Sequence, residues 1–253
     1  RQDATDPAAT GYALSAAETL LSTLNAHFAG SLNYLKQTDP AVNLVVQAKY
    51  NPERKTQYNI VPGLLGVVLT MTMIVITSLA ITRERERGTM ESLLAMPVRP
   101  LEVMLGKLIP YIVVGYIQVI LILIAARFLF DVPIEGSLLL LFLSCLPFIA
   151  ANLSVGLTFS TLARNQLQAM QMSFFFFLPS ILLSGFMFPF RGMPEWAQYL
   201  GNVLPLTHFL YITRGILLKG NNFSQILPEI EAISVFLFFA LIIGLKRYRQ
   251  TLD

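Results

Sequence analysis

The chain has 253 residues, of which 55% are hydrophobic and only 13% charged, and its mean hydropathy is +0.61. An ordinary soluble domain carries about 25% charged residues, so this composition excludes one and indicates an integral membrane protein. The net charge of +3 does not indicate a nucleic-acid partner, because the basic residues lie mostly between apolar runs and not on a polar surface. A single cysteine, Cys145, permits no internal disulfide, and without a Cys/His cluster no metal site is predicted.

Residues 1–59 precede the first apolar run and are expected to form part of an α+β domain outside the membrane. Apolar residues recur at three- and four-residue spacing at about residues 15–36, which predicts a helix. Residues 42–50 alternate apolar and polar side chains between two prolines, which predicts a strand. A lone strand leaves its edge groups unpaired, and the chain begins without a methionine. We therefore expect a further span and the rest of this domain upstream.

Five apolar runs follow, each close to the ~20 residues that a helix needs to cross a bilayer. They predict spans at about residues 60–82, 103–130, 137–162, 167–188 and 228–245. Lys and Arg are retained on the cytoplasmic side of a membrane, and here they gather after the first, third and fifth runs. Those joints are predicted to be cytoplasmic. The N-terminal 59 residues and the segment at about 189–227 are predicted to lie outside.

The joint between the first two spans is densely charged. It reads Glu84-Arg-Glu-Arg-Gly-Thr-Met-Glu91, then Ser-Leu-Leu-Ala-Met-Pro97. Its apolar residues form a stripe, which predicts a short amphipathic helix at about 84–96, apolar toward the bundle and charged toward a partner. The alternative is a solvated anchor, in which Arg87 and Glu91 form an i,i+4 pair.

The segment at about 189–220 is the second unusual element. Three prolines break it, yet it is too apolar for a solvated loop. Short helices that dip back into the membrane from outside would explain both properties, because irregular backbone at that depth must pack on protein or line a wet cavity. We predict re-entrant helices here.

Several kinds of chemistry are missing from the sequence. No Asp or Glu lies within the first four spans, which argues against a proton-coupled secondary transporter. The chain has no HExxH, GxSxG or phosphate-binding loop, so it cannot hydrolyse ATP alone. His208 is expected to be a satisfied interfacial residue. Three uncharged polar residues are expected to bridge helices: Asn152, Asn165 and Gln171.

The charged joint with Leu93-Leu-Ala-Met-Pro97 resembles the inner-face coupling region of ABC-2 type permeases, the membrane subunits of one class of ABC exporters. The segment Phe188-Pro-Phe-Arg-Gly-Met-Pro-Glu-Trp196, followed by Leu204-Pro-Leu-Thr207 and Arg214, resembles the family's signature before its last span. The resemblance covers about Tyr50 to Arg249, with both motifs in the family's order and topology. It implies a membrane all-α bundle of six spans, of which five are present here. The external region is similar to that of a subgroup with an extracytoplasmic domain between spans one and two, often linked to drug export.

The resemblance also implies partners and site residues. Two permease subunits, the same or homologous, would each carry a cytoplasmic ATPase subunit that binds ATP and Mg, while this chain holds no cofactor. Membrane lipids and a periplasmic adaptor are further candidate partners. The residues expected to couple to the ATPase are Glu84, Arg85, Glu86, Arg87, Gly88, Thr89 and Glu91. The re-entrant signature comprises Pro189, Met193, Pro194, Trp196, Pro205, Thr207 and Arg214.

The favoured function is a permease that exports a lipophilic or amphipathic small molecule from the cytoplasm or inner leaflet. The spans are rich in aromatic residues and nearly free of charge, so they offer apolar burial but no counter-charge for a compact ion. The candidate substrate route comprises Phe159, Phe174, Phe175, Phe176 and Phe177. The alternatives are a membrane scaffold that docks a partner without transport, and a permease for a lipid, a glycan or an ion.

Overall fold

The computed structural model describes residues 15–24, 56–88 and 100–250. The chain divides into two compact units, Arg1–Asn59 and Ile60–Asp253, and each is described by itself. In the first unit residues 15–24 are helical, within the range predicted for a helix. The rest of that helix and the predicted strand lie outside the described residues. The described ranges contain no strand, so an α+β domain is not shown.

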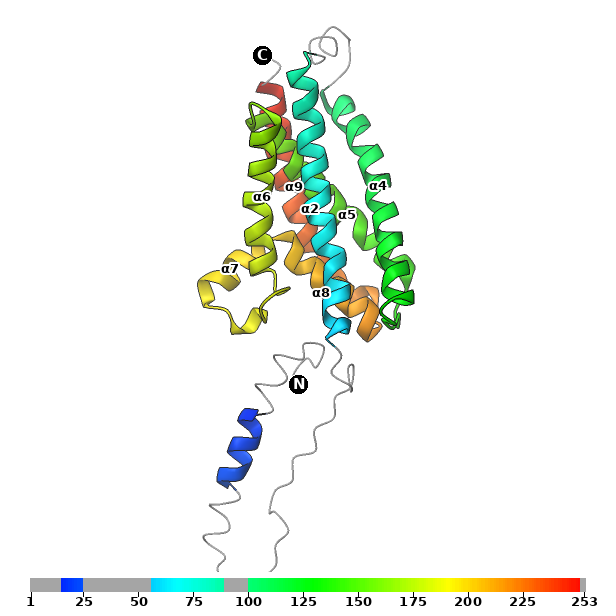
Figure 1. Ribbon diagram of the computed structural model, residues 1–253, viewed down its shortest axis with the longest axis vertical. Coiled ribbons are helices and arrows are strands. Elements are labelled where there is room, and N and C mark those ends of the chain that lie inside the picture. The colour runs from blue at the N-terminus through cyan, green and yellow to red at the C-terminus, as the bar shows by residue number, and fades with distance from the viewer. Residues whose placement is uncertain (1–14, 25–55, 89–99, 251–253) are drawn as a thin grey trace, which may run out of the picture. The chain divides into compact units, whose positions relative to one another are not determined.

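The second unit is a bundle of long helices (Figure 1). They are α2 (Gln57–Glu86), α4 (Pro100–Phe128), α5 (Leu138–Leu162), α6 (Gln166–Leu183) and α9 (Phe223–Gln250). All five are long and apolar enough to cross a membrane. The five predicted spans and the all-helical bundle are therefore confirmed, and the chain is a multi-pass membrane protein.

Successive long helices run in opposite directions, which gives the bundle two distinct ends (Figure 1). At one, here called the charged end, α2 finishes and α6 begins. At the other, here called the cap end, lie η1 (Phe190–Gly192), α7 (Glu195–Val203) and α8 (Pro205–Lys219). The α4–α5 turn joins them there, because the N–H of Glu135 donates to the carbonyl of Leu217 at 3.0 Å. The joints that the charge pattern assigns to one side of the membrane thus lie at one end.

The core of the bundle is centred on α5. Phe148 of α5 stacks on Phe209 of α8, with ring centroids 3.9 Å apart and planes 3° from parallel, and both side chains are fully buried. The α5 helix has a glycine, Gly156, where α2 passes. A Cβ at this position would lie 2.7 Å from the carbonyl oxygen of Ile74, so the two helix backbones are in direct contact.

Away from the charged end, the hydrogen bonds between the spans come from residues that the sequence did not single out. The prediction was wrong for Asn152, which donates to the carbonyl of Phe148 in its own helix, and for Asn165, which caps α6. Gln171 is exposed. The bridges are made by Ser78 with Ser173 at 2.9 Å, Thr72 with Gln118 at 2.8 Å, and Tyr116 with the carbonyl of Phe142 at 3.0 Å.

Each of the five long helices contains a proline. They are Pro62 in α2, Pro110 in α4, Pro147 in α5, Pro179 in α6 and Pro228 in α9. A proline within a helix has no N–H to donate to the carbonyl four residues earlier, and its ring presses on that carbonyl. Each helix therefore lacks one hydrogen bond of its ladder.

Candidate functional site

The first residues of the charged joint belong to α2. A separate helix was predicted from about residue 84, but Glu84, Arg85 and Glu86 form the last turn of α2. No proline or glycine lies between Gly66 and Gly88, and Gly88, whose φ of 71° is left-handed, ends the helix. Thr89, Glu91 and the remainder of the predicted amphipathic helix lie outside the described residues.

The last turn of α2 is bonded to the start of α6. A carboxylate oxygen of Glu86 accepts from the backbone N–H of Gln166 at 2.8 Å, and its other oxygen accepts from the Gln166 side-chain amide. The Nε of Arg83 donates to Oε1 of Gln166 at 3.4 Å. Arg87, the next charged residue, is exposed. Of the predicted coupling residues, Glu86 is therefore engaged in a contact within the bundle and Arg87 is exposed.

At the cap end, the prolines of the signature segment set where the short helices begin. Pro189 precedes η1, Pro194 precedes α7, and Pro205 is the first residue of α8. A proline suits the first position of α8 because the first N–H groups of a helix have no intrahelical acceptor, and its fixed φ is already helical. The segment forms short helices, with Leu204 as the only residue between α7 and α8, and their re-entrant placement in the membrane stays a prediction.

The remaining signature residues have different environments. The buried Thr207 hydroxyl donates to the carbonyl of Gly201 at 2.6 Å, which ties α8 to α7. Arg214 is half-buried and donates from Nη1 to the carbonyl of Gly185 at 3.4 Å. Met193 is partly buried, and Trp196 is 65% exposed. The signature therefore comprises structural contacts around α8 and an exposed indole on α7.

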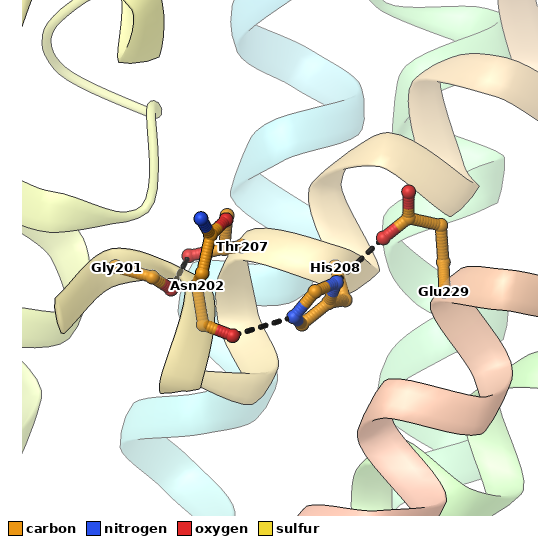
Figure 2. Close-up of polar contacts among 5 residues, drawn as sticks. All are labelled: Gly201, Asn202, Thr207, His208 and Glu229. Carbon is orange, nitrogen blue, oxygen red and sulfur yellow. Dashed lines mark hydrogen bonds and ion pairs between the residues drawn. The ribbon is translucent and has the colours of Figure 1, made fainter. Parts of the chain in front are cut away.

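His208 links the short helices to the last span, and Figure 2 shows its contacts. Its Nδ1 lies 2.5 Å from Oε2 of Glu229 in α9, and its Nε2 lies 2.8 Å from the carbonyl oxygen of Asn202 in α7. Both ring nitrogens thus face acceptors. Only the imidazolium can donate to both at once, so this geometry favours the charged form. His208 is satisfied at an interface, as the sequence predicted.

The environment acts on His208 in two opposite directions. Burial favours the neutral ring and lowers its pKa. The hydrogen bonds to Glu229 and to the Asn202 carbonyl, together with the charge of Glu229, outweigh burial and raise the pKa above its ordinary value of 6.5. The contact is therefore an ion pair over a wider range of pH than an unperturbed histidine would allow.

We expect the His208–Glu229 pair to stabilise the folded protein at low pH and to lose that contribution as pH rises. A raised folded-state pKa means that the stabilisation is complete below pH 6.5 and fades as pH passes the folded pKa. In Glu229→Gln the loss should be about 1 kcal/mol at pH 5.5, a reduced value because Glu229 is 32% exposed. Thermal unfolding in detergent from pH 5.5 to 8.5 measures the difference, with Glu231→Gln as the matched control. A difference in Tm between wild type and Glu229→Gln that grows as pH rises would contradict a raised His208 pKa.

Comparison with known proteins decides the family. The model of the ABC-2 type transporter family matches residues 12–218. The chain belongs to the ABC-2 type transporter family. It is 35% identical over 203 residues to the probable multidrug ABC transporter permease YbhS of Escherichia coli, a match that covers 80% of this chain and 52% of that protein.

Two other relatives agree with this placement of the ABC-2 chain. It is 31% identical over 222 residues to the inner membrane transport permease YhhJ of Escherichia coli, covering 87% of the chain and 59% of YhhJ. It is 31% identical over 170 residues to ABC transporter G family member 20 of Dictyostelium discoideum, a match that covers 67% of this chain and 23% of that protein. The chain thus spans about half the length of its bacterial relatives. As an ABC-2 permease it is a membrane component, and its 253 residues contain no ATPase motif.

The phenylalanine row of this ABC-2 chain does not line a single surface. Phe175 is 75% exposed, while Phe176 packs edge-on against Phe159 of α5 with ring centroids 6.0 Å apart. Phe177 packs on the main core, and Phe174 is half-buried. Consecutive residues of a helix point about 100° apart, so the row must divide in this way. Of the five candidates, the structure brings Phe159 and Phe176 together.

The described part of the ABC-2 chain holds no group of three or more side chains suited to a metal ion. Sequence reasoning missed the two polar contacts at the ends of the bundle, Glu86 with Gln166 and His208 with Glu229. Their partners are 80 and 21 residues apart in the sequence, and no local pattern connects them. The sequence held weak signals for both contacts. Glu86 is a carboxylate at the end of a span, and His208 and Glu229 both lie on the side of the membrane predicted to be outside.

Proposed function

We propose that this chain is the membrane-spanning permease of an ATP-driven exporter that moves a lipophilic or amphipathic small molecule out of the cytoplasm or inner leaflet. The observation that carries the proposal is the separation of the two ends in an ABC-2 chain. The charged joint leaves the bundle beside the α5–α6 turn, and the proline-bounded helices cover the opposite end. Such a bundle can receive work at one end and release cargo at the other.

The proposed orientation follows from the basic residues. The charged end would face the cytoplasm and contact the ATPase subunit through residues 84–96, and the cap end and residues 1–59 would lie outside. A second permease subunit, the same or homologous, would complete the transporter, and a periplasmic adaptor is a further candidate partner. The name of one relative, inner membrane transport permease, supports a bacterial inner membrane location.

The proposed substrate class follows from the side chains inside the bundle. The membrane segments of α4, α5 and α6, at 108–128, 138–162 and 166–183, contain no Asp or Glu. The Phe159–Phe176 pair lies in an apolar cluster with Ile74 and Val155. These surfaces bind by dispersion and area burial and offer no fixed counter-charge to a compact anion or cation. The word multidrug in the names of two relatives favours the same class.

Reconstitution tests this proposal. The full-length permease is purified with the ATPase that copurifies, and uptake of a lipophilic dye into inside-out vesicles is followed with and without ATP. We expect ATP-dependent uptake that vanadate abolishes. An ATPase that copurifies but supports no transport of any compound would favour the scaffold, and transport of only a small inorganic ion would overturn the substrate class.

A matched pair of variants tests the route. Phe176→Ala removes a ring from the buried Phe159–Phe176 contact and should change the dye concentration at half-maximal uptake. Phe238→Ala removes an exposed ring from α9 and should leave that concentration unchanged. Equal effects of the two variants would exclude Phe176 from the route.

A further inference from the structure

The contact between α2 and α6 at the charged end consists of three hydrogen bonds on one residue of α6. Glu86 accepts from both the backbone N–H and the side-chain amide of Gln166, and Arg83 donates to the oxygen of the same amide. Gln166 is the first residue of α6. One glutamine therefore has its backbone N–H and both side-chain polar atoms engaged by the last turn of another span.

Glu86 completes the N-terminus of α6. The first N–H groups of a helix have no intrahelical acceptor. The Asn165 side chain accepts from the N–H of Gln168, and Glu86 accepts from that of Gln166. The side-chain hydrogen bond from Gln166, followed by the bond from its N–H, lowers the pKa of Glu86. A charged carboxylate is also the group that a helix N-terminus favours.

A second bond between the same helices lies deeper in the bundle. The hydroxyls of Ser78 in α2 and Ser173 in α6 are 2.9 Å apart and buried. Ser78 lies eight residues before Glu86, and Ser173 seven after Gln166, which at 1.5 Å per residue are spacings of about 12 Å and about 10.5 Å. Because the spacings nearly match along antiparallel helices, the two contacts together resist both separation and tilt of α2 relative to α6.

The position of this contact gives it a mechanical role. Glu86 lies two residues before Gly88, where α2 ends and the chain enters the proposed coupling segment. Beyond Gln166, α6 carries the phenylalanine row and then leads toward α7 at the cap end. A displacement applied at the end of α2 can therefore pass to α6 without going through the core.

We propose that Glu86 is a positioning residue that holds the end of α2 and the start of α6 as one unit, so that motion of the coupling segment moves α6. This role rests on the proposed function, because it assumes that work enters at residues 84–96. It differs from the sequence-based prediction for Glu86, in which this carboxylate itself meets the ATPase. Exposed polar contacts add little to the free energy of unfolding. The expected consequence of losing this one is therefore that motion of the coupling segment no longer moves α6.

The first test needs neither substrate nor nucleotide. Spin labels are attached at Arg87→Cys and Leu167→Cys, two exposed positions beside the contact, in a Cys145→Ser background of the full-length permease. We expect strong dipolar coupling between the labels and a clear weakening when Glu86→Ala is added. Glu231→Ala, an exposed carboxylate on α9, is the control. Unchanged dipolar coupling in Glu86→Ala would overturn the proposal even if the complex transports dye.

The second test measures transmission in the complex with its ATPase. Glu86→Ala should keep ATP hydrolysis but lower the dye transported per ATP by at least about fivefold, a usual size for coupling between sites. The double variant Glu86→Gln with Gln166→Glu keeps an amide–carboxylate pair. It should restore part of the dye transported per ATP that Glu86→Ala loses. A wild-type complex without transport would refute the proposed function, and a Glu86→Ala complex with an unchanged ratio would refute the role of Glu86.

Discussion

Gly156→Leu is expected to leave little folded permease in the membrane. Any side chain at this position meets the backbone of α2, because a Cβ would lie 2.7 Å from the Ile74 carbonyl oxygen and 2.9 Å from Cβ of Thr77. Backbone atoms cannot turn aside as a flexible side chain can. Overpacking costs about 1–3 kcal/mol in cores that can adjust, and we expect about 3 kcal/mol or more here. The yield of monodisperse protein and its Tm in detergent measure the loss.

Gly106→Leu is the matched control for this substitution. Gly106 also lies within a long helix, α4, but nothing stands within 4 Å of a Cβ placed there. Leucine has a better helix propensity than glycine by about 0.5–1 kcal/mol, so this variant should be at least as stable as wild type. Similar yields from the two variants would show that α2 and α5 do not touch as described.

Reversing two charges of the joint, Glu84→Lys with Glu91→Lys, is expected to abolish dye transport while the protein still inserts into the membrane. If these carboxylates face basic groups of the ATPase, the new lysines oppose like charge, which costs several kcal/mol across an interface and weakens docking by about two orders of magnitude or more. Copurification of the ATPase and ATP-dependent dye uptake both report the effect.

The control for charge reversal makes the same change in net charge elsewhere. Glu18→Lys with Glu231→Lys alters two exposed carboxylates, in the N-terminal unit and on α9. This variant should keep both the ATPase and transport. Full transport by Glu84→Lys/Glu91→Lys would reduce the joint to the solvated anchor that its Arg and Glu alternation also fits.

The spans could be predicted because their signal is local: an uncharged run long enough to cross a bilayer is visible without knowing its neighbours. Hydropathy does not set where a span ends. The fourth run was extended to Phe188, but α6 ends at Leu183, followed by Gly185 with a φ of 82°. Hydropathy counts Phe186 as membrane-embedded whether it is helical or not, and here it packs beyond the helix against Gly63.

Contacts between the helices could not be predicted, because a sequence does not specify which face of one apolar helix meets another. Asn152 was expected to bridge helices as a strong polar group, yet its amide bonds within α5 and the smaller Ser78 and Ser173 form the bridge. Helices that approach closely leave room for small hydroxyls at the contact. The five phenylalanines of the candidate route do not share one surface, for the related reason that neighbouring residues on a helix point in different directions.

The internal prolines affect how the long helices respond to force. Pro147 has no N–H to donate to the carbonyl of Leu143, and Pro179 has none to donate to that of Phe175. Each helix therefore consists of two regular segments joined at the position where one backbone hydrogen bond is missing. Bending at such a joint breaks no further backbone bond, whereas bending an intact helix strains several. These two spans can therefore change curvature at Pro147 and at Pro179 at a lower free-energy cost than at other positions.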